Sequence, residues 1–428
     1  MKIPYGKSSI QIPDLWYGRA NVLLPGPFPD SDPEKIVTHA LDNSLGGVSL
    51  EKLCRAGSRI ACVIPDLTRR AAVREYLPVL LQRLSDIGVG QTDVTIIVAL
   101  GIHRTLTDAE LRELVGDEIR NRYRVINHDA DGKGSNILLG KTDAGIPVHI
   151  NKSVVKADCV ILTGGITYHY FAGYGGGRKS LLPGVASRQA CEAHHRLVVS
   201  WRRGELKGEL GPGVLTDNPV HRQMVQACTF ISPIFVLNVV TEPGGRIVAA
   251  SAGELETAHM DACQKHDSWF RRELQGPSKL VIAGAGGYPK DVNFVQAHKG
   301  LFGAHQAVAG DGVVVLAADC GEGTGHVDLL GWFDRCHSES KWLDELQARY
   351  QINGQTAFST WLRVTSVPTL LLSRLKRSEV ARMGMIPAND MKEALTAVEK
   401  ILGELPVPLV IPDAGEVLPV VGNAECKV

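Results

Sequence analysis

What this sequence lacks excludes several classes of protein. Its 46 Lys and Arg residues are matched by 46 Asp and Glu residues, so it has no excess of positive charge for binding nucleic acid or an anionic membrane. It contains no apolar run long enough to span a membrane, and its N-terminal segment lacks the apolar core of a signal peptide. We therefore expect no nucleic-acid partner and no membrane partner.

The cysteines form no recognisable framework. There are nine of them, an odd number, and none stands in the C-x-x-C spacing of a structural zinc site. Scattered, unpaired cysteines are typical of a reducing compartment, where most serve as small buried residues. We therefore expect a cytoplasmic protein.

The pattern of the 428 residues predicts an α/β fold with mainly parallel sheets, because short β-rich apolar runs alternate with amphipathic helical stretches. The length predicts two or three domains, and we divide the chain into two α/β domains, residues 1–270 and 271–428, with an active-site cleft between them. Strands are expected at residues 60–64, 94–100, 123–127, 159–162, 279–283, 312–317 and 406–411. Helices are expected at residues 71–84, 107–115, 256–274 and 293–309.

Polar residues follow the first two predicted strands directly. Asp66, Thr68 and Arg69 come after the strand at 60–64, and His103 comes after the next strand. Ligands bind at the carboxyl edge of an open parallel sheet, so these side chains are placed to bind a phosphate, a ribose hydroxyl or a carboxylate. The alternatives are a helix cap formed by Asp66 or Thr68, and a loop histidine bonded to a backbone carbonyl.

The segment 164–197 combines more chemistry than any other part of the chain. Its functional groups are His169, a glycine-rich turn with Gly173, Gly175, Gly176 and Gly177, the pair Arg178 and Lys179, and the adjacent His194 and His195. Glycine permits close backbone approach, and the N–H groups of such a turn can bind an anion. Lysine supplies a charge or a nucleophilic amine, and histidine supplies a proton shuttle or a metal ligand. The turn lacks P-loop spacing, and a merely flexible loop is the alternative.

A further polar group follows the strand predicted at 279–283. A glycine-rich turn leads to Gln296 and Lys299, which are three residues apart and so share one face of the predicted helix. A solvated helix face is the alternative interpretation. Another glycine-rich patch, at residues 320–326, follows the next strand.

Together these motifs resemble those of the nickel-dependent lactate racemase family. The motifs occur in the same order and at similar spacing over residues 60–330: P-D-x-T-R, A-L-G-x-H-R, H-Y-F-A-G-Y-x-G-G-R-K-S-x-L-P-G-V-A and G-G-Y-P-K-D. Members of the family use a nickel-pincer nucleotide, a pyridinium mononucleotide with two sulfur arms that grip nickel together with a ring carbon. Soft sulfur donors with one imidazole suit Ni(II).

The resemblance implies a role for each matching residue. Lys179 would attach the cofactor covalently, His195 would bind the nickel, and His103 and His169 would be the catalytic acid–base pair. Arg69 and Lys299 would bind the substrate carboxylate. The residues that would support the cofactor or substrate are Asp66, Thr68, Gly175, Gly176, Gly177 and Gln296.

The implied reaction is inversion at C2 of a 2-hydroxy acid by reversible hydride transfer to the nickel-pincer nucleotide. Enzymes of cofactor synthesis would be transient partners.

Three positions of this sequence depart from the pattern of the family. His194 stands beside His195, so either imidazole can in principle be the ligand; Gly175 replaces a common serine; and Val295 stands where lactate-specific members have tyrosine.

We therefore predict a 2-hydroxy acid racemase or epimerase without assigning lactate, malate, an aryl-lactate or an aldonate as its substrate. One alternative is a catalytically silent nucleotide-binding member of the family. A conventional NAD-dependent dehydrogenase is disfavoured, because P-D-L-T-R-R stands where G-x-G-x-x-G is expected.

Overall fold

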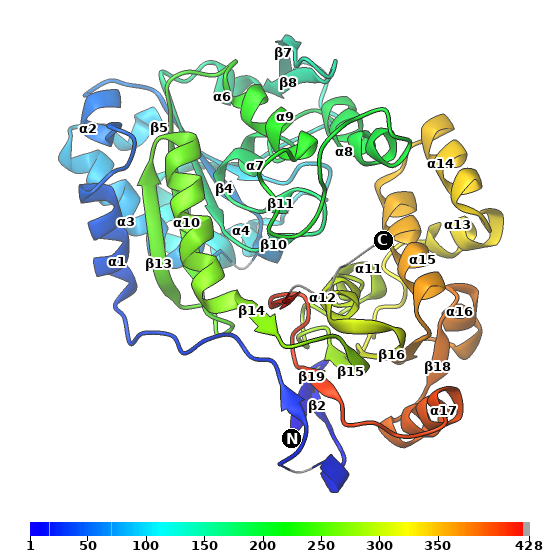
Figure 1. The fold of residues 1–428 in the computed structure, drawn as a ribbon. Helices are drawn as coiled ribbons and strands as arrows, with labels where there is room; N and C mark the ends of the chain where they lie inside the picture. The colour runs from blue at the N-terminus through cyan, green and yellow to red at the C-terminus, as the bar shows by residue number, and fades with distance from the viewer. Residues whose placement is uncertain (17, 70, 423–428) are drawn as a thin grey trace. The chain divides into compact units, whose positions relative to one another are not determined.

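The computed structural model describes residues 1–16, 18–69 and 71–422. The chain forms two compact units. Figure 1 shows the chain coloured by residue number. The central unit is Pro27–Ser268, and the C-terminal unit joins Met1–Gly26 to Trp269–Val428.

The first 26 residues thus belong to the C-terminal unit, whereas the sequence pattern assigns them to the first domain. The reason is strand pairing over a long sequence distance. β3 (Asn21–Val22) pairs in parallel with β19 (Leu409–Ile411), and β1 (Lys2–Tyr5) packs on β15 (Ser278–Gly284). No local pattern in residues 1–26 reveals such a partner.

The central unit is built on a six-stranded sheet in which five neighbouring strands are parallel and one edge strand is antiparallel. In spatial order these are β13 (Ile247–Gly253), β12 (Ile234–Thr241), β9 (Cys159–Gly165), β4 (Ile60–Pro65), β5 (Val94–Ala99) and β6 (Arg124–Asn127). The strands predicted in this part of the chain are all present, and β12 and β13 are additional.

Helices cover this sheet, and short hairpins extend from it (Figure 1). The helices are α1 (Pro33–Asp42), α2 (Leu50–Leu53), α3 (Val73–Asp86), α4 (Asp108–Val115), α5 (Asp117–Arg122), α6 (Lys152–Val155), α7 (Gly177–Leu181), α8 (Arg188–Arg202), α9 (Pro219–Cys228) and α10 (Leu255–Phe270). The hairpins are β7 (Asn136–Lys141) with β8 (Pro147–Asn151), and β10 (Tyr168–His169) with β11 (Gly173–Tyr174).

Both faces of the central sheet are buried, which is why its strands are continuous apolar runs. Alternate side chains of β4 enter two different cores. Ile60, Cys62 and Ile64 join the core that contains α1 and α3 residues. Ala61 and Val63 join the core that contains α8 and α9 residues. The result is a three-layer α/β arrangement.

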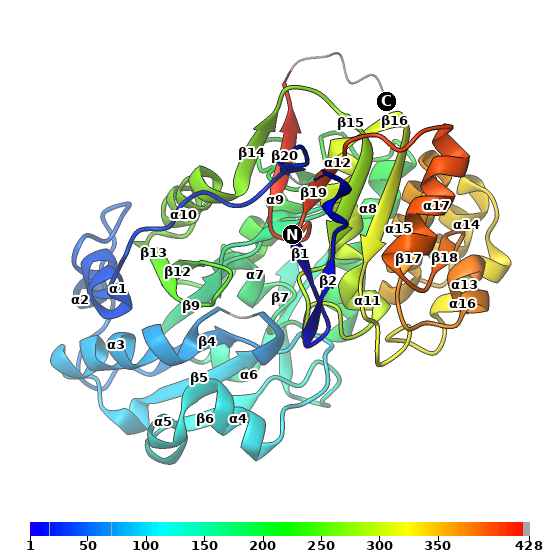
Figure 2. The ribbon, with the colours of Figure 1, turned by 90° about the horizontal axis from the view of Figure 1, so that it is seen from below.

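The C-terminal unit has a second six-stranded sheet, which is parallel throughout. Its spatial order is β18 (Ile386–Ala388), β17 (Thr369–Leu372), β16 (Val308–Ala317), β15, β19 and β3, and Figure 2 shows β15 beside β16. Its helices are α11 (Phe294–Ala297), α12 (Lys299–Ala307), α13 (Leu329–Arg335), α14 (Glu339–Ala348), α15 (Ile352–Ser366), α16 (Arg377–Arg382) and α17 (Met391–Leu402). The predicted fold class, two α/β units with mainly parallel sheets, is confirmed.

Two predicted helices differ in the structure. The helix predicted at 256–274 ends at Phe270, and its last residues form β14 (Arg271–Leu274) because they pair with β20 (Leu418–Val421). The helix predicted at 293–309 is divided into α11 and α12.

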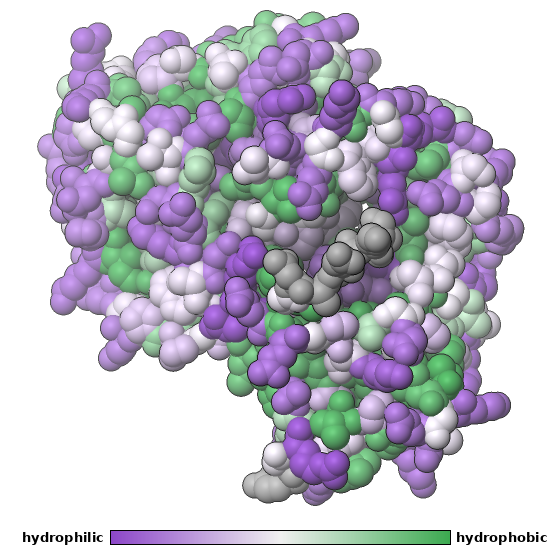
Figure 3. All heavy atoms as spheres, in the orientation of Figure 1, coloured by the Kyte–Doolittle hydropathy of each residue, from purple (hydrophilic) through white to green (hydrophobic). Residues whose placement is uncertain are grey.

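The surface is mixed in character. Figure 3 shows hydrophilic and hydrophobic residues interspersed over the visible face. Among the described residues, no helix is both long and apolar enough to cross a membrane. Eight of the nine cysteines are buried free thiols, and Cys426 lies outside the described residues.

Candidate functional site

Three neighbouring strands of the central sheet, β9, β4 and β5, lead into predicted site residues. Asp66 follows β4, His103 follows β5, and His169 lies in the β10–β11 hairpin that follows β9. Because these strands are parallel neighbours, their carboxyl ends lie at one edge of the sheet.

Asp66 and His103 form a hydrogen-bonded pair at this edge. Oδ2 of Asp66 lies 2.7 Å from Nδ1 of His103. The Asp66 side chain is only 2% exposed, whereas that of His103 is 45% exposed. The histidine ring is therefore open to a ligand on one side and tethered to a buried carboxylate on the other.

The remaining contacts of Asp66 keep its carboxyl group ionised. Its Oδ1 accepts hydrogen bonds from the backbone N–H of Thr68 at 3.0 Å and from the Thr68 hydroxyl at 2.6 Å. Nε of Arg69 lies 4.0 Å from the same oxygen. Burial raises the pKa of Asp66, but the His103 hydrogen bond and the Arg69 charge outweigh burial and hold it well below its usual range.

An ionised carboxylate only accepts hydrogen bonds, so Nδ1 of His103 carries a proton. In the neutral ring Nε2 then has a lone pair, which is the form that a general base requires. The Asp66 contact thus fixes both the orientation and the tautomer of His103.

His169 is held in the opposite tautomer. It lies opposite Gly173 in the β10–β11 hairpin, and its Nδ1 accepts a hydrogen bond from the N–H of Ala172 at 3.3 Å. A neutral imidazole that accepts at Nδ1 carries its proton on Nε2. The neutral rings of His103 and His169 therefore carry their protons on different nitrogens.

His195 lies on α8 with one ring nitrogen free. Its Nδ1 lies 2.7 Å from the carbonyl oxygen of Cys191, so Nδ1 donates and Nε2 keeps a lone pair. Burial lowers the pKa of His195 to about 4, and the charges of Lys179 and Arg69 contribute to this. The ring is consequently neutral at physiological pH, as a metal ligand must be.

The adjacent His194 faces a different environment. It is 1% exposed, and its Nε2 lies 3.2 Å from the carbonyl oxygen of Val220 on α9. This geometry favours His195 as the ligand and His194 as a packing residue between two helices.

An aromatic contact joins two of the predicted functional histidines. The ring centroid of Phe171 lies 4.5 Å from that of His169 and 5.5 Å from that of His195, edge-on in both cases. Lys179, Arg69 and His103 are also close enough to His195 for their charges to lower its pKa. One locality of the central unit therefore contains the proposed acid–base, anchoring and metal-binding groups.

The glycine-rich turn is buried and tightly packed. Gly176 has φ +98°, and a Cβ on it would lie 2.5 Å from Cδ1 of Ile166. The N–H of Gly175 donates to the carbonyl of Thr167, and that of Gly177 donates to Oδ1 of Asn238 at 2.7 Å. In this structure both N–H groups are already paired, so the glycines here serve close backbone packing.

Lys179 lies in α7 directly after this turn. It is partly exposed, whereas Arg178 and Ser180 on either side of it are buried. The backbone N–H of Lys179 donates to the carbonyl of Gly176 at 2.8 Å, which fixes the base of its side chain.

Arg178 supports the turn by contacts that the sequence pattern did not predict. Its guanidinium donates to the carbonyl groups of Ala172 (3.1 Å), Tyr174 (3.2 Å) and Gly175 (2.9 Å). It also donates to Nδ1 of His221 at 2.7 Å and contacts Nε2 of His259. These contacts hold the turn that precedes Lys179. No local signal marks His221 or His259, because both are brought to Arg178 by the fold.

The predicted residues Gln296 and Lys299 belong to the C-terminal unit. Nζ of Lys299 donates to Oε1 of Gln296 at 2.8 Å, as their spacing predicts. Gln296 lies in α11 and Lys299 begins α12, so the two share a face across a helix break.

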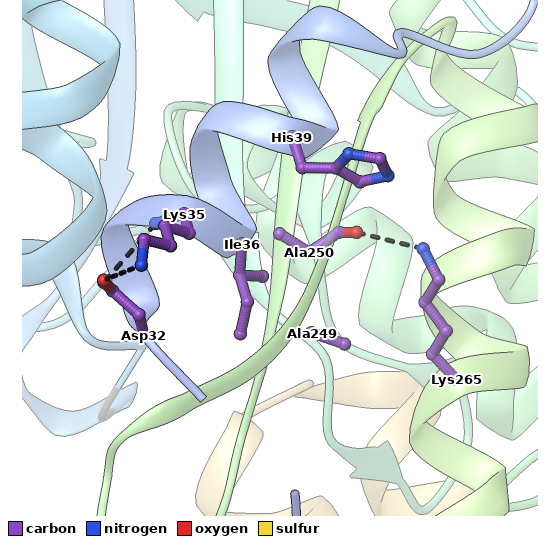
Figure 4. A pocket seen from close by; sticks show the side chains of 7 residues that line it. All are labelled: Asp32, Lys35, Ile36, His39, Ala249, Ala250 and Lys265. Carbon is purple, nitrogen blue, oxygen red and sulfur yellow. Dashed lines mark hydrogen bonds and ion pairs between the residues drawn. The ribbon is translucent and has the colours of Figure 1, made fainter. Parts of the chain in front are cut away.

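A surface pocket of about 320 Å³ lies away from these groups, beside α1, β13 and α10 (Figure 4). It is lined by Asp32, Lys35, Ile36, His39, Ala249, Ala250 and Lys265. Nζ of Lys265 donates to the Ala250 carbonyl at 3.0 Å, which caps the edge strand β13. Among the described residues, no group of three or more His, Cys, Asp or Glu side chains is placed to hold a metal ion.

The fold and the site define a two-unit α/β protein with two histidines, a buried aspartate and a lysine after neighbouring strands of a parallel sheet. Comparison with known protein families shows to which family the chain belongs. The lactate racemase N-terminal domain matches residues 5–205, and the lactate racemase C-terminal domain matches residues 274–418. The chain belongs to the lactate racemase family, as its motifs indicate.

Two relatives extend this match. A lactate racemase of Thermoanaerobacterium thermosaccharolyticum is 31% identical over 434 residues, which cover 98% of each chain. A lactate racemase of Lactiplantibacillus plantarum is 32% identical over 332 residues, which cover 76% of this chain and 75% of the relative.

Solved structures agree with the family assignment. The lactate racemase apoprotein of T. thermosaccharolyticum superposes with a TM-score of 0.88 at 30% identity, over 99% of this chain and all of that one (100%). A Thermotoga maritima protein has a TM-score of 0.70 at 19% identity over 93% of this chain, a likeness of fold alone.

Proposed function

We propose that this protein is a cytoplasmic racemase or epimerase that inverts C2 of a small 2-hydroxy acid. The observation that carries the proposal is that His103 and His169 are each held at Nδ1 in a defined orientation. His103 is tied at Nδ1 to Asp66, and His169 accepts at Nδ1 from Ala172. Inversion needs one group to take a hydroxyl proton and another to return a proton, and histidine serves in both directions near neutral pH.

The residues of the central unit fit a nickel-pincer nucleotide. Lys179 would carry it covalently, and Nε2 of His195 would provide the imidazole ligand to nickel. A single neutral imidazole beside sulfur donors is a suitable ligand set for Ni(II). When bound, this cofactor would supply a reversible acceptor for the hydride from C2 of the substrate.

Side chains of the protein would transfer the hydroxyl proton and bind the carboxylate of the substrate. In one direction Nε2 of His103 would take the hydroxyl proton, and His169 as the imidazolium would donate a proton to the hydroxyl oxygen of the opposite enantiomer. In the reverse direction His169, then neutral, would take the proton and His103 would return it. Arg69 would bind the substrate carboxylate, which its partly exposed guanidinium (44% exposed) allows.

We propose the same function for Lys299 of the C-terminal unit, with Gln296 supporting cofactor or substrate. Their hydrogen bond would orient the ammonium group. Val295 is partly exposed and lacks the hydroxyl of a tyrosine, so we propose a 2-hydroxy acid as the substrate class and leave lactate as one member of it.

The test is intact-mass analysis after co-expression with the enzymes of cofactor synthesis, which we propose as transient partners. The wild-type chain should gain the mass of the nucleotide, and Lys179→Ala should not. His103→Gln and His169→Gln should gain it yet fail to racemise. A wild-type chain without adduct or nickel under these conditions would reject the proposed function and favour a catalytically silent member of the family.

A further inference from the structure

The hairpin that carries His169 is tied to helix α10 by one carboxylate. The hydroxyl of Tyr168 donates to Oδ1 of Asp267 at 2.8 Å. The hydroxyl of Tyr174 lies 2.8 Å from both Oδ1 and Oδ2 of the same side chain. Two hydroxyls from the two strands of one hairpin therefore converge on one acceptor.

The strand register explains how this tie acts on His169. Tyr168 pairs with Tyr174 across the β10–β11 hairpin, and His169 pairs with Gly173. Successive side chains of a strand point to opposite faces, so the two tyrosines share one face and His169 lies on the other. Holding the tyrosine face thus fixes the direction in which His169 points.

The surroundings of Asp267 support a rigid contact. The Tyr168 and Tyr174 rings are 5.4 Å apart, and His266 packs edge-on against Tyr168 at 4.6 Å. Burial raises the pKa of Asp267, but His266 and the hydrogen bonds from the two tyrosines lower it overall. An ionised acceptor makes hydrogen bonds that are shorter and stronger than those between neutral groups.

We propose that Asp267 is a positioning residue for His169, acting through Tyr168 and Tyr174. This rests on the proposed role of His169 as an acid–base group. Asp267 touches neither the substrate nor the cofactor in this account. It lies directly before the end of the central unit at Ser268, in the helix by which the chain enters the C-terminal unit. The direction of His169 is thereby linked to the segment that connects the units.

The test compares Asp267→Asn with Asp261→Asn in the cofactor-loaded protein. Asp261 is a matched control on the same helix, where it pairs with Lys265 and Ser251. Asp267→Asn keeps the shape but weakens both tyrosine contacts, so kcat should fall about tenfold or more while KM changes little, the pattern of a lost transition-state arrangement. Asp261→Asn should leave both constants unchanged.

A double-mutant cycle and a spectrum separate positioning from general damage. In the Tyr168→Phe, Tyr174→Phe background, Asp267→Asn should have little further effect on kcat, because the tie is already broken. In ¹⁵N-histidine NMR spectra the wild type should show His169 protonated at Nε2, and Asp267→Asn should show mixed tautomers. The spectrum needs no bound cofactor.

Different results would reject the acid–base role of His169 and the positioning role of Asp267. If His169→Gln racemises normally, the proposed function of His169 is wrong and Asp267 loses its target. If His169→Gln is inactive but Asp267→Asn has wild-type kcat and a wild-type His169 spectrum, the positioning role alone is wrong. Equal losses in Asp267→Asn and Asp261→Asn would also overturn it.

Discussion

His103 and Asp66 are joined by a 2.7 Å contact between Nδ1 and Oδ2, from a half-exposed ring to a buried carboxylate. The other carboxylate oxygen, Oδ1, accepts hydrogen bonds from the backbone N–H and the hydroxyl of Thr68. The position of the carboxylate is therefore fixed before any ligand binds. This preorganisation gives the proposed base a defined direction and a defined proton.

Replacing Asp66 with asparagine should therefore impair catalysis without unfolding the protein. Thr68 would still donate to the oxygen of the new side-chain amide, so the amide NH₂ would face His103 and favour the wrong tautomer. We expect kcat to fall about 100-fold, within the range that a general base contributes. Steady-state kinetics measure this. Asp158→Asn, which breaks an exposed pair with Arg59, is the control and should keep wild-type kcat. Wild-type turnover by Asp66→Asn would reject the orienting role.

Removing the His195 imidazole should separate metal binding from cofactor attachment. His195→Ala should retain the covalent adduct at Lys179, but its nickel content should be lower by about tenfold or more, because one ligand to the metal is missing. Nickel content by mass spectrometry of the desalted protein, together with the intact mass, provides the measurement. His194→Gln is the matched control, since its ring faces Val220, and it should retain nickel. The opposite pattern would make His194 the ligand.

Introducing tyrosine at Val295 should change substrate preference. The side chain is partly exposed next to Gln296, and its Cβ lies close to Gly325. An added hydroxyl and ring should favour lactate over bulkier 2-hydroxy acids by about tenfold in kcat/KM, the usual effect of one pocket contact. A panel of 2-hydroxy acids measures the ratio. An unchanged ratio would mean that residue 295 does not shape the substrate site.

Acid should destabilise the turn before Lys179. Burial and the Arg178 charge lower the pKa of His221 to about 3. Between its ordinary pKa of about 6.5 and the folded value, the unfolded chain binds a proton that the folded chain does not, so stability falls as pH decreases through this range. Urea unfolding at several pH values measures the slope. His221→Asn keeps an acceptor near Nδ1 but cannot be protonated, and should show a shallower pH dependence; an unchanged slope would refute this origin.

Much of the site was predictable because its residues lie directly after buried strands. The apolar run before Asp66 and the one before His103 mark adjacent parallel strands, so their meeting follows from general rules of α/β sheets. The residue types alone leave His194 and His195 open as the ligand, and the family resemblance favours His195. Which of the two rings faces α9 follows only from the packing of the helices.

The unpredicted features all rest on long-range contacts. Residues 1–26 join the C-terminal unit through the pairing of β3 with β19. Arg178 contacts His221 and His259, which lie on helices distant from it in the sequence, and Tyr168 donates a hydrogen bond to Asp267 on α10. Local periodicity reports which residues are buried, but it does not report their partners.

The most direct test of the proposed function is chiral chromatography of a single 2-hydroxy acid enantiomer incubated with the cofactor-loaded protein. The panel should include lactate, malate, an aryl-lactate and an aldonate. We expect at least one of them to be inverted at C2, and we expect His103→Gln and His169→Gln to carry the adduct but to invert none. Unchanged enantiomers throughout the panel, from a chain that carries nickel and the adduct, would contradict the proposed function.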